Sequence, residues 1–105
     1  MNNETLNLEA DIVKTLKNIH DPEIPVNIYD LGLIYEIKID EEMQVEIVMT
    51  MTSPNCPMAD DLLNDVYEQT GKIPSVKKVK VQLTFDPPWD QDRMTEEAKL
   101  DLGFL

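Results

Sequence analysis

Two runs of alternating apolar and polar residues, joined by a short acidic turn, constrain the fold of this chain more than any other feature. Residues 33–39 carry apolar side chains at every second position, and residues 45–52 repeat the pattern. The link between them is only a few residues long and includes Asp40-Glu41-Glu42, so the two runs form an antiparallel hairpin. Each strand has one apolar face, which another layer of structure must cover.

Helical periodicity flanks this hairpin on both sides. An apolar stripe with the spacing of a helix runs from Leu8 to Ile19, and Pro22 just beyond it ends the helix. A second stripe runs from Ala59 to Val66, with Gly71 as its C-terminal stop. Both helices can therefore cover the apolar face of the hairpin.

A third alternating run and a short helix complete the chain. Residues 78–85 alternate between inward apolar and outward polar side chains, and Phe85 is the last inward one. Thr95 is placed to cap a final helix over residues 96–102. The element order α-β-β-α-β-α predicts an α/β fold of the α+β-like kind: a small mixed three-stranded sheet with helices mainly on one face.

Length, charge and cysteine content narrow the class of protein. The 105 residues suffice for a single domain, residues 1–105, in which the polar residues 1–5 are expected to be frayed. A net charge of −12 repels both nucleic acid and anionic membranes, which excludes them as partners. The sequence has no signal peptide and no apolar run near the roughly 20 residues of a spanning helix. One cysteine cannot form an internal disulfide, so we expect a cytoplasmic protein.

The topology predicts that three loops meet at one edge of the sheet. The second strand, its helix and the third strand form a crossover, so these strands run parallel, and the first strand is antiparallel to both. Residues 21–32, 52–56 and 86–89 then share an edge, and they hold the only cysteine, the only tryptophan and five of the seven prolines. Strand carboxyl ends are where open α/β sheets bind ligands, so we expect the functional site there.

Cys56 stands directly before Pro57, a residue favoured at the first position of a helix. The thiol is therefore expected at or near the helix N-cap, where unpaired amides and the helix dipole favour an anion. The thiolate is the reactive and metal-binding form of cysteine. The alternative is an inert buried cysteine, against which the preceding Ser-Pro-Asn loop argues.

Asp21, Glu23 and Trp89 have two interpretations each. Asp21 and Glu23 follow a helix C-terminus, where carboxylates are disfavoured, which suggests a cation, a hydrogen-bond donor or a metal as partner. The alternative is a polar turn around Pro22. Trp89 either covers the core beneath a loop or anchors a partner protein.

The count of ligands limits the metal sites that one chain can hold. A closed zinc site takes about four Cys or His ligands, and this chain offers only Cys56 and His20. An iron–sulfur cluster would have to bridge subunits, use other ligand types or be handled only in transit. Cys56 with His20 and Asp21 also suggests a thiol enzyme, although neither oxyanion donors nor a substrate pocket can be argued from the sequence.

Four of the eight lysines fall within nine residues, namely Lys72, Lys77, Lys78 and Lys80. They either neutralise acidic residues across the sheet or form a small patch for an acidic partner. Met49 and Met51 lie on the apolar face of a strand and are interpreted as core residues.

Four motifs at the predicted edge resemble a family of small iron–sulfur assembly proteins, first catalogued as domain of unknown function fifty-nine. The motifs are Asp21-Pro22-Glu23, Asp30-Leu31-Gly32-Leu33, Thr52-Ser53-Pro54-Asn55-Cys56-Pro57 and Asp86-Pro87-Pro88-Trp89 through Arg93-Met94. The family includes the bacterial SUF-associated protein SufT, the phenylacetate-oxygenase accessory protein PaaD and the eukaryotic cytosolic iron–sulfur targeting subunit. The resemblance covers about residues 8–105 and is nearest to the single-domain bacterial form, because the cysteine-rich C-terminal region of PaaD-type members is absent.

The resemblance implies the same α/β element order and a role as an accessory factor, not an enzyme, in iron–sulfur cluster assembly or delivery with the SUF system. It implies that Cys56 handles iron or a labile cluster, in transit or bridged across a homodimer. The partners would be iron–sulfur assembly proteins and client apoproteins. The alternative is a metal-free adaptor that recruits clients. The supporting or partner-binding positions implied by the motifs are Asp21, Glu23, Thr52, Trp89 and Met94.

Overall fold

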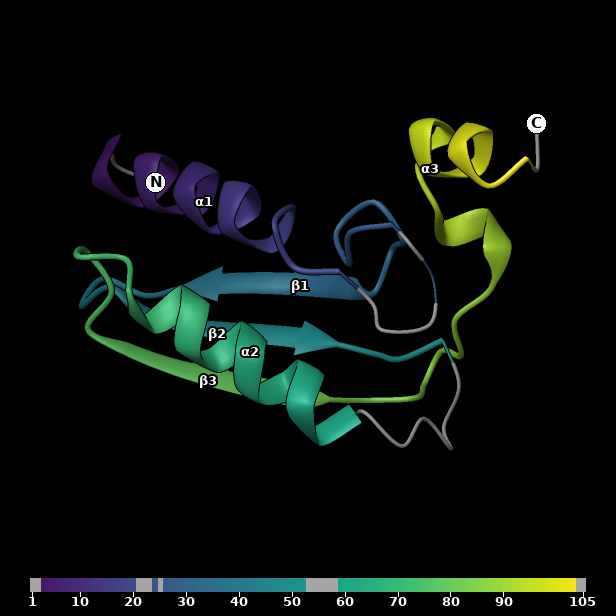
Figure 1. Ribbon diagram of the computed structural model, residues 1–105. Coiled ribbons are helices and arrows are strands. Elements are labelled where there is room, and N and C mark those ends of the chain that lie inside the picture. Colours follow the sequence, from purple (N-terminus) through teal and green to yellow (C-terminus); the bar gives the residue numbers. More distant parts are fainter. Residues whose placement is uncertain (1–2, 21–23, 25, 53–58, 104–105) are drawn as a thin grey trace.

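The computed structural model describes residues 3–20, 24, 26–52 and 59–103, and it contains the predicted order of elements (Figure 1). The elements are α1 (Asn3–Leu16), β1 (Ile34–Ile39), β2 (Gln44–Met49), α2 (Ala59–Gly71), β3 (Lys78–Leu83), the 3-10 helix η1 (Gln91–Arg93) and α3 (Glu96–Asp101). Within these described residues, no helix has the length and apolar character needed to cross a membrane.

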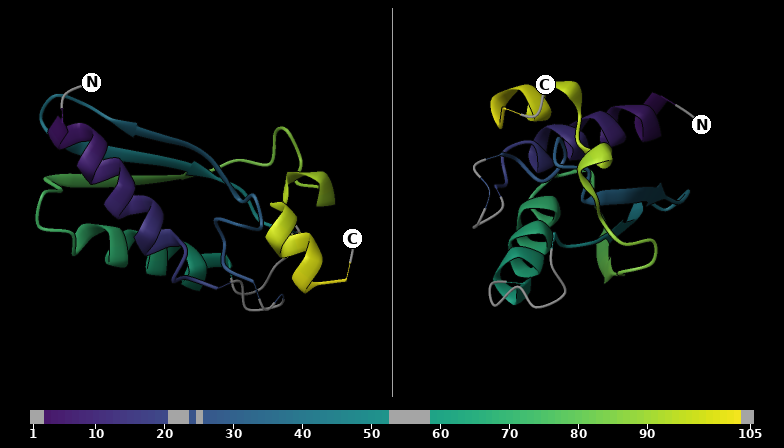
Figure 2. Two further views of the ribbon diagram at one scale, coloured as in Figure 1. Left: turned by 90° about the horizontal axis from the view of Figure 1, so that it is seen from above. Right: turned by 90° about the vertical axis from the view of Figure 1, so that its right-hand side faces the viewer.

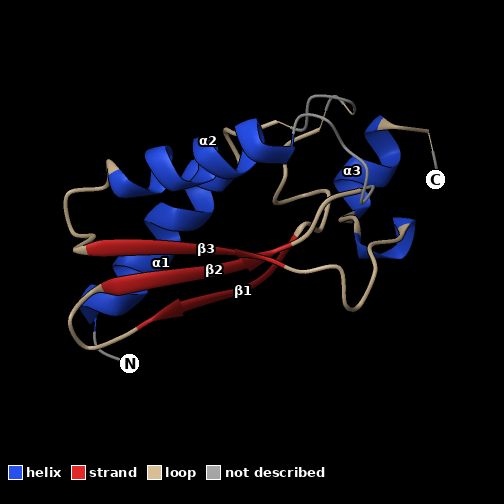
Figure 3. Ribbon diagram, turned by 90° about the horizontal axis from the view of Figure 1, so that it is seen from below, coloured by secondary structure: helices blue, strands red, loops and turns tan. Residues whose placement is uncertain are grey.

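The sheet is mixed, as predicted, with the strand order β1-β2-β3 (Figure 3). β1 pairs with β2 in antiparallel fashion and β2 pairs with β3 in parallel, with Ile47 of β2 opposite Ile37 and Val81. The parallel pair requires a crossover connection, which α2 provides.

Helices α1 and α2 cover the same face of the sheet, which confirms the predicted layering (Figures 2 and 3). The apolar stripes identified in the sequence line this interface, because Leu8, Ile12 and Leu16 of α1 are buried together with Leu62 and Val66 of α2. Alternate residues of β2 close the core from the sheet side. Burial of these side chains supplies the main stabilisation of the fold.

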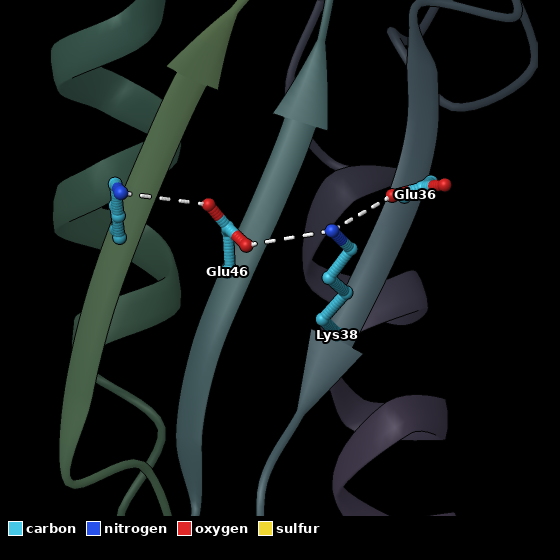
Figure 4. A network of polar contacts seen from close by, with 4 residues as sticks. Glu36, Lys38 and Glu46 are labelled. Carbon is cyan, nitrogen blue, oxygen red and sulfur yellow. Dashed lines mark ion pairs between the residues drawn. The ribbon is translucent and has the colours of Figure 1, made fainter.

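The other face of the sheet is open and carries a row of ion pairs across all three strands (Figure 4). Lys38 Nζ lies 3.2 Å from Glu36 and 3.7 Å from Glu46, and Lys80 Nζ lies 3.7 Å from the second oxygen of Glu46. The hydrogen bond that the Lys38 ammonium donates to the Glu36 carboxylate, the charge of Glu36 and the charge of Glu46 raise the pKa of Lys38. The ion pairs of Lys38 therefore contribute to folding stability at neutral pH, and this contribution is lost only when the pH rises through the pKa of Lys38 in the folded state. Solvent screening keeps it small.

Both ends of the first helix differ from the sequence-based expectation. Residues 3–5, expected to be frayed, belong to α1, because backbone hydrogen bonds extend the helix by one turn before the buried Leu8. At the other end, α1 stops at Leu16 although the apolar stripe continues to Ile19. Residues 17–19 form a tighter turn, in which the Ile19 N–H donates to the Leu16 carbonyl. The Ile19 carbonyl then accepts a hydrogen bond from the Ile28 N–H, so extended tertiary pairing begins where the helix would have continued.

Two aromatic residues also depart from strict alternation. A register shift between Ile34 and Glu36 removes Tyr35 from the inward-facing row, and its hydroxyl donates a hydrogen bond to the Pro87 carbonyl. Phe85, predicted to face the core, is 40% exposed. The Asp86 N–H donates to the Thr84 hydroxyl at 3.2 Å, and this turn ends β3 before Phe85 is reached.

Thr70 on α2 places a polar hydroxyl group in the buried part of the fold. Its hydroxyl is fully buried and has no hydrogen-bond partner among the described residues. Burying such a group costs about 1–3 kcal/mol, so Thr70→Val should raise the free energy of unfolding by about 1 kcal/mol. Urea denaturation followed by far-UV circular dichroism measures the change.

Thr95→Val is the matched control for that substitution. The Thr95 hydroxyl caps α3 by accepting a hydrogen bond from the Ala98 N–H at 3.2 Å. Its removal should lower the free energy of unfolding by about 1 kcal/mol. A loss of stability in Thr70→Val would show that its hydroxyl has a partner and would overturn the prediction.

Candidate functional site

The described parts of the three predicted loops meet at one edge of the sheet, where β1 begins and β2 and β3 end (Figures 1 and 2). Backbone hydrogen bonds join the strand ends from which these loops leave. The Thr50 N–H donates to the Leu33 carbonyl at 2.8 Å, and the Thr84 N–H donates to the Met49 carbonyl at 2.9 Å. The convergence inferred from topology is therefore confirmed for these segments.

The turn before β1 is held by its own polar side chains. The Asp30 N–H donates to the Asn27 side-chain oxygen at 2.8 Å, and the Asn27 amide donates to the Asp30 carboxylate at 2.9 Å. Leu31 and Leu33, on either side of Gly32, are buried in the core. The Asp30 carboxylate thus has a structural role in shaping the turn that feeds β1.

Gly32 allows the close approach of a second segment to this turn. Its φ of +81° lies in the left-handed region, and a Cβ atom there would overlap the carbonyl oxygen of Arg93. The Thr95 N–H also donates to the Asp30 carbonyl at 2.9 Å. The segment from η1 to α3 is thereby fixed against the turn before β1.

Trp89 covers this junction. Its indole N–H donates to the Leu31 carbonyl at 2.6 Å, and its half-buried ring packs against the core. This placement matches the first interpretation of Trp89, a cover over the core. Met94 is buried in the same core.

Thr52, half-buried after the end of β2, is the last described residue before the gap at 53–58. Cys56, Asp21 and Glu23 lie outside the described residues. His20, directly before Asp21, is exposed, and its backbone pairs with Asn27. The described ranges contain no group of three or more His, Cys, Asp and Glu residues placed to hold a metal ion.

A groove of about 560 Å³ opens on the outer sheet face beside this edge. The guanidinium of Arg93 lies 4.7 Å from the centre of the Tyr35 ring, and both side chains line the groove with Gln82 and Thr84. Sequence analysis included Arg93 only within a motif and did not single out Tyr35. Their contact depends on the register shift in β1, for which the alternating pattern gives no signal.

Comparison with known proteins identifies the family. The model of a family described as iron–sulfur cluster assembly protein matches residues 9–83, which is most of the chain. The chain belongs to this family. The resemblance stated from the four motifs is confirmed.

Several relatives match along nearly their whole length. The "Fe-S protein maturation auxiliary factor" of Porphyromonas gingivalis is 52% identical over 105 residues, which is 100% of each chain. The "Fe-S protein maturation auxiliary factor YitW" of Bacillus subtilis is 38% identical over 96 residues, 91% of this chain and 94% of the relative. The "Fe-S protein maturation auxiliary factor SufT" of Staphylococcus aureus is 36% identical over 83 residues, 79% of this chain and 94% of the relative.

Solved structures of similar proteins share the fold. The crystal structure of a domain of unknown function DUF59 from Bacillus anthracis aligns with a TM-score of 0.89 and 36% identity, over 99% of this chain and 100% of the other. A conserved hypothetical protein from Thermotoga maritima aligns with a TM-score of 0.79 and 43% identity, over 90% and 93% of the two chains. The predicted α/β architecture is thus that of the family.

Gly32→Ala tests whether the junction at this edge depends on the close backbone approach. A left-handed backbone costs a non-glycine residue about 1–2 kcal/mol, and the clash with Arg93 adds to this, so the free energy of unfolding should fall by about 3 kcal/mol. Urea denaturation followed by the fluorescence of Trp89 measures it.

Gly71→Ala is the control, because no described atom lies within 4 Å of the added Cβ apart from its chain neighbours and the backbone of its own helix, and α2 ends at this residue. It should raise the free energy of unfolding by about 0.5–1 kcal/mol. Equal effects of the two substitutions would refute the proposed role of Gly32.

Proposed function

We propose that this chain is an accessory protein for the assembly of iron–sulfur clusters or their delivery to client apoproteins, working with the SUF system, and that Cys56 handles iron or a labile cluster. The observation that carries the proposal is the 52% identity, over the full length of both chains, to a relative named as an Fe–S protein maturation auxiliary factor. The SufT name of the Staphylococcus aureus relative supports the link to the SUF system.

The position of Cys56 in the sequence supports its role. It lies three residues before the first described residue of α2, Ala59, and four after Thr52. The N-terminus of a helix stabilises an anion, and a thiolate is the form of cysteine that binds iron. The described segments that flank residues 53–58, the end of β2 and the start of α2, both lie at the converging edge (Figure 1).

The remaining residues of the motifs have supporting roles in this proposal. Asp21 and Glu23 would supply a carboxylate ligand or orient groups of a partner protein, since carboxylates bind iron well. Thr52 would donate a hydrogen bond near the thiolate. Trp89 and Met94 would keep the edge in shape, which their packing against the core supports.

The iron or cluster would be cargo. One cysteine supplies too few thiolates for a cluster held by cysteines alone, so a cluster would be bridged by two copies of the chain or held together with a partner. The proposed partners are therefore assembly proteins, client apoproteins and, in the bridged form, a second copy. A cytoplasmic location fits a reduced thiol.

Cys56→Ala should leave the fold intact and abolish cluster handling. Anaerobic reconstitution with iron and sulfide, followed by iron quantitation and visible absorption, should give Cys56-dependent absorption with stoichiometric iron in the wild type only. Circular dichroism should show the same unfolding transition for both proteins. In cells, the variant should fail to restore the activity of cluster-dependent enzymes.

An acidic protein also adsorbs iron through surface carboxylates, so a control is needed. Replacing the exposed turn residues Asp40, Glu41 and Glu42 by their amides should lower adsorbed iron and leave the Cys56-dependent absorption unchanged. Unfolding of Cys56→Ala, or full restoration of enzyme maturation by it, would refute the role of the thiol. Absence of bound iron in both proteins would favour the metal-free adaptor instead.

A further inference from the structure

A groove of about 420 Å³ lies between the C-terminal end of α2 and the start of β3. Three of the four clustered lysines line it, namely Lys72, Lys77 and Lys78. Lys78, at the start of β3, also lines a hollow on the open sheet face together with Lys80, which pairs there with Glu46. Figure 1 shows that the end of α2 and the start of β3 lie at the opposite end of the sheet from the converging edge.

The three lysines of this groove are exposed and form no ion pair with any described residue. The lysines that do form ion pairs lie elsewhere: Lys38 and Lys80 pair with Glu46, and Lys99 pairs with Asp92. Glu68 is the one acidic residue that lines the groove within the described chain. On a protein with a net charge of −12, the groove is therefore a local concentration of unneutralised positive charge.

Apolar surface lies beside these charges. Tyr67, in the last two turns of α2, is 54% exposed, and Val76 and Val79 line the same groove. A tyrosine ring next to free ammonium groups suits a partner that offers an apolar side chain together with carboxylates.

We propose that this lysine groove docks an acidic segment of a partner protein, with an apolar side chain of that segment packed on Tyr67. Charge complementarity favours this occupant. A long polyanion such as RNA would extend beyond the groove and meet the acidic remainder of the surface, whereas a short acidic segment meets only the lysines. The proposal goes beyond the role of Cys56 and does not depend on it, because the two lie on different parts of the chain.

A synthetic peptide tests the proposal: a short segment of Asp and Glu around one Leu and one Phe. Nitrogen-15 NMR titration of the wild-type protein should shift the amides of Tyr67, Lys72 and Lys77–Val79. Added salt should weaken binding, since exposed charges are screened. The same peptide with Asn and Gln in place of Asp and Glu should not bind.

Two triple variants with the same change in net charge show whether peptide binding depends on the lysines of the groove or only on the net charge of the protein. Lys72→Gln/Lys77→Gln/Lys78→Gln should weaken peptide binding about tenfold, since three exposed charge pairs are lost. Lys14→Gln/Lys17→Gln/Lys38→Gln, whose residues lie on α1, directly after α1 and on β1, should leave affinity within about twofold. Circular dichroism verifies that both variants fold.

Four outcomes would overturn the proposal. They are shifts mapped away from the groove, equal weakening by the two variants, displacement of the peptide by a single-stranded RNA, and wild-type self-association that the groove variant abolishes. The last would make a second copy of the chain the occupant. Cys56→Ala should bind the peptide as the wild type does. Refutation of the groove proposal would therefore not affect the iron-handling proposal, and refutation of the iron-handling proposal would not affect the groove proposal.

Discussion

The parallel pairing of β2 with β3 is the constraint on which the rest of this structure depends. A parallel pair cannot be closed by a tight turn, so the chain must cross from one end of the sheet to the other, and it does so through α2. The crossover places α2 beside α1 on one face and leaves the other face open. It also brings the ends of β2 and β3 to the edge where β1 begins, so that residues distant in sequence become neighbours.

That edge is built mainly from backbone contacts. The indole of Trp89 and the N–H of Thr95 both bond to carbonyls of the turn before β1, and Gly32 lets the chain at Arg93 come into contact with that turn. Contacts of this kind hold the described segments of the edge together, with the Asn27 and Asp30 side chains bracing the turn itself. The residues of the family motifs therefore divide into two groups: those that hold the described edge together, and Asp21, Glu23 and Cys56, which the proposed function assigns to iron or a partner protein.

Sequence alone predicted the layers and the element order because periodicity records which side of each element is buried. Leu8, Ile12 and Leu16 of α1, Leu62 and Val66 of α2, and the inward row of β2 are in the core as expected. What it could not predict depends on tertiary contacts. The early end of α1 follows from the pairing of Ile19 with Ile28, and the position of Tyr35 follows from a register shift in β1. The convergence of loops could be predicted because it follows from strand direction, but the bond from Trp89 to Leu31 could not, since no local pattern encodes a contact 58 residues apart.

The distribution of charge gives the open face of the sheet and the end at which β3 begins different properties. On the open face, Glu46 lies between Lys38 and Lys80, so this surface neutralises its own charges and offers little attraction to a partner. At the start of β3 the positive charges have no such counterparts among the described residues, although the molecule has an excess of acidic residues that could have supplied them. Lysines also protect an edge strand such as β3 from pairing with other chains, but Lys72 lies directly after α2 and outside that strand. Edge protection alone therefore does not account for the lysine groove, which is why its positive charge indicates recognition of an acidic partner.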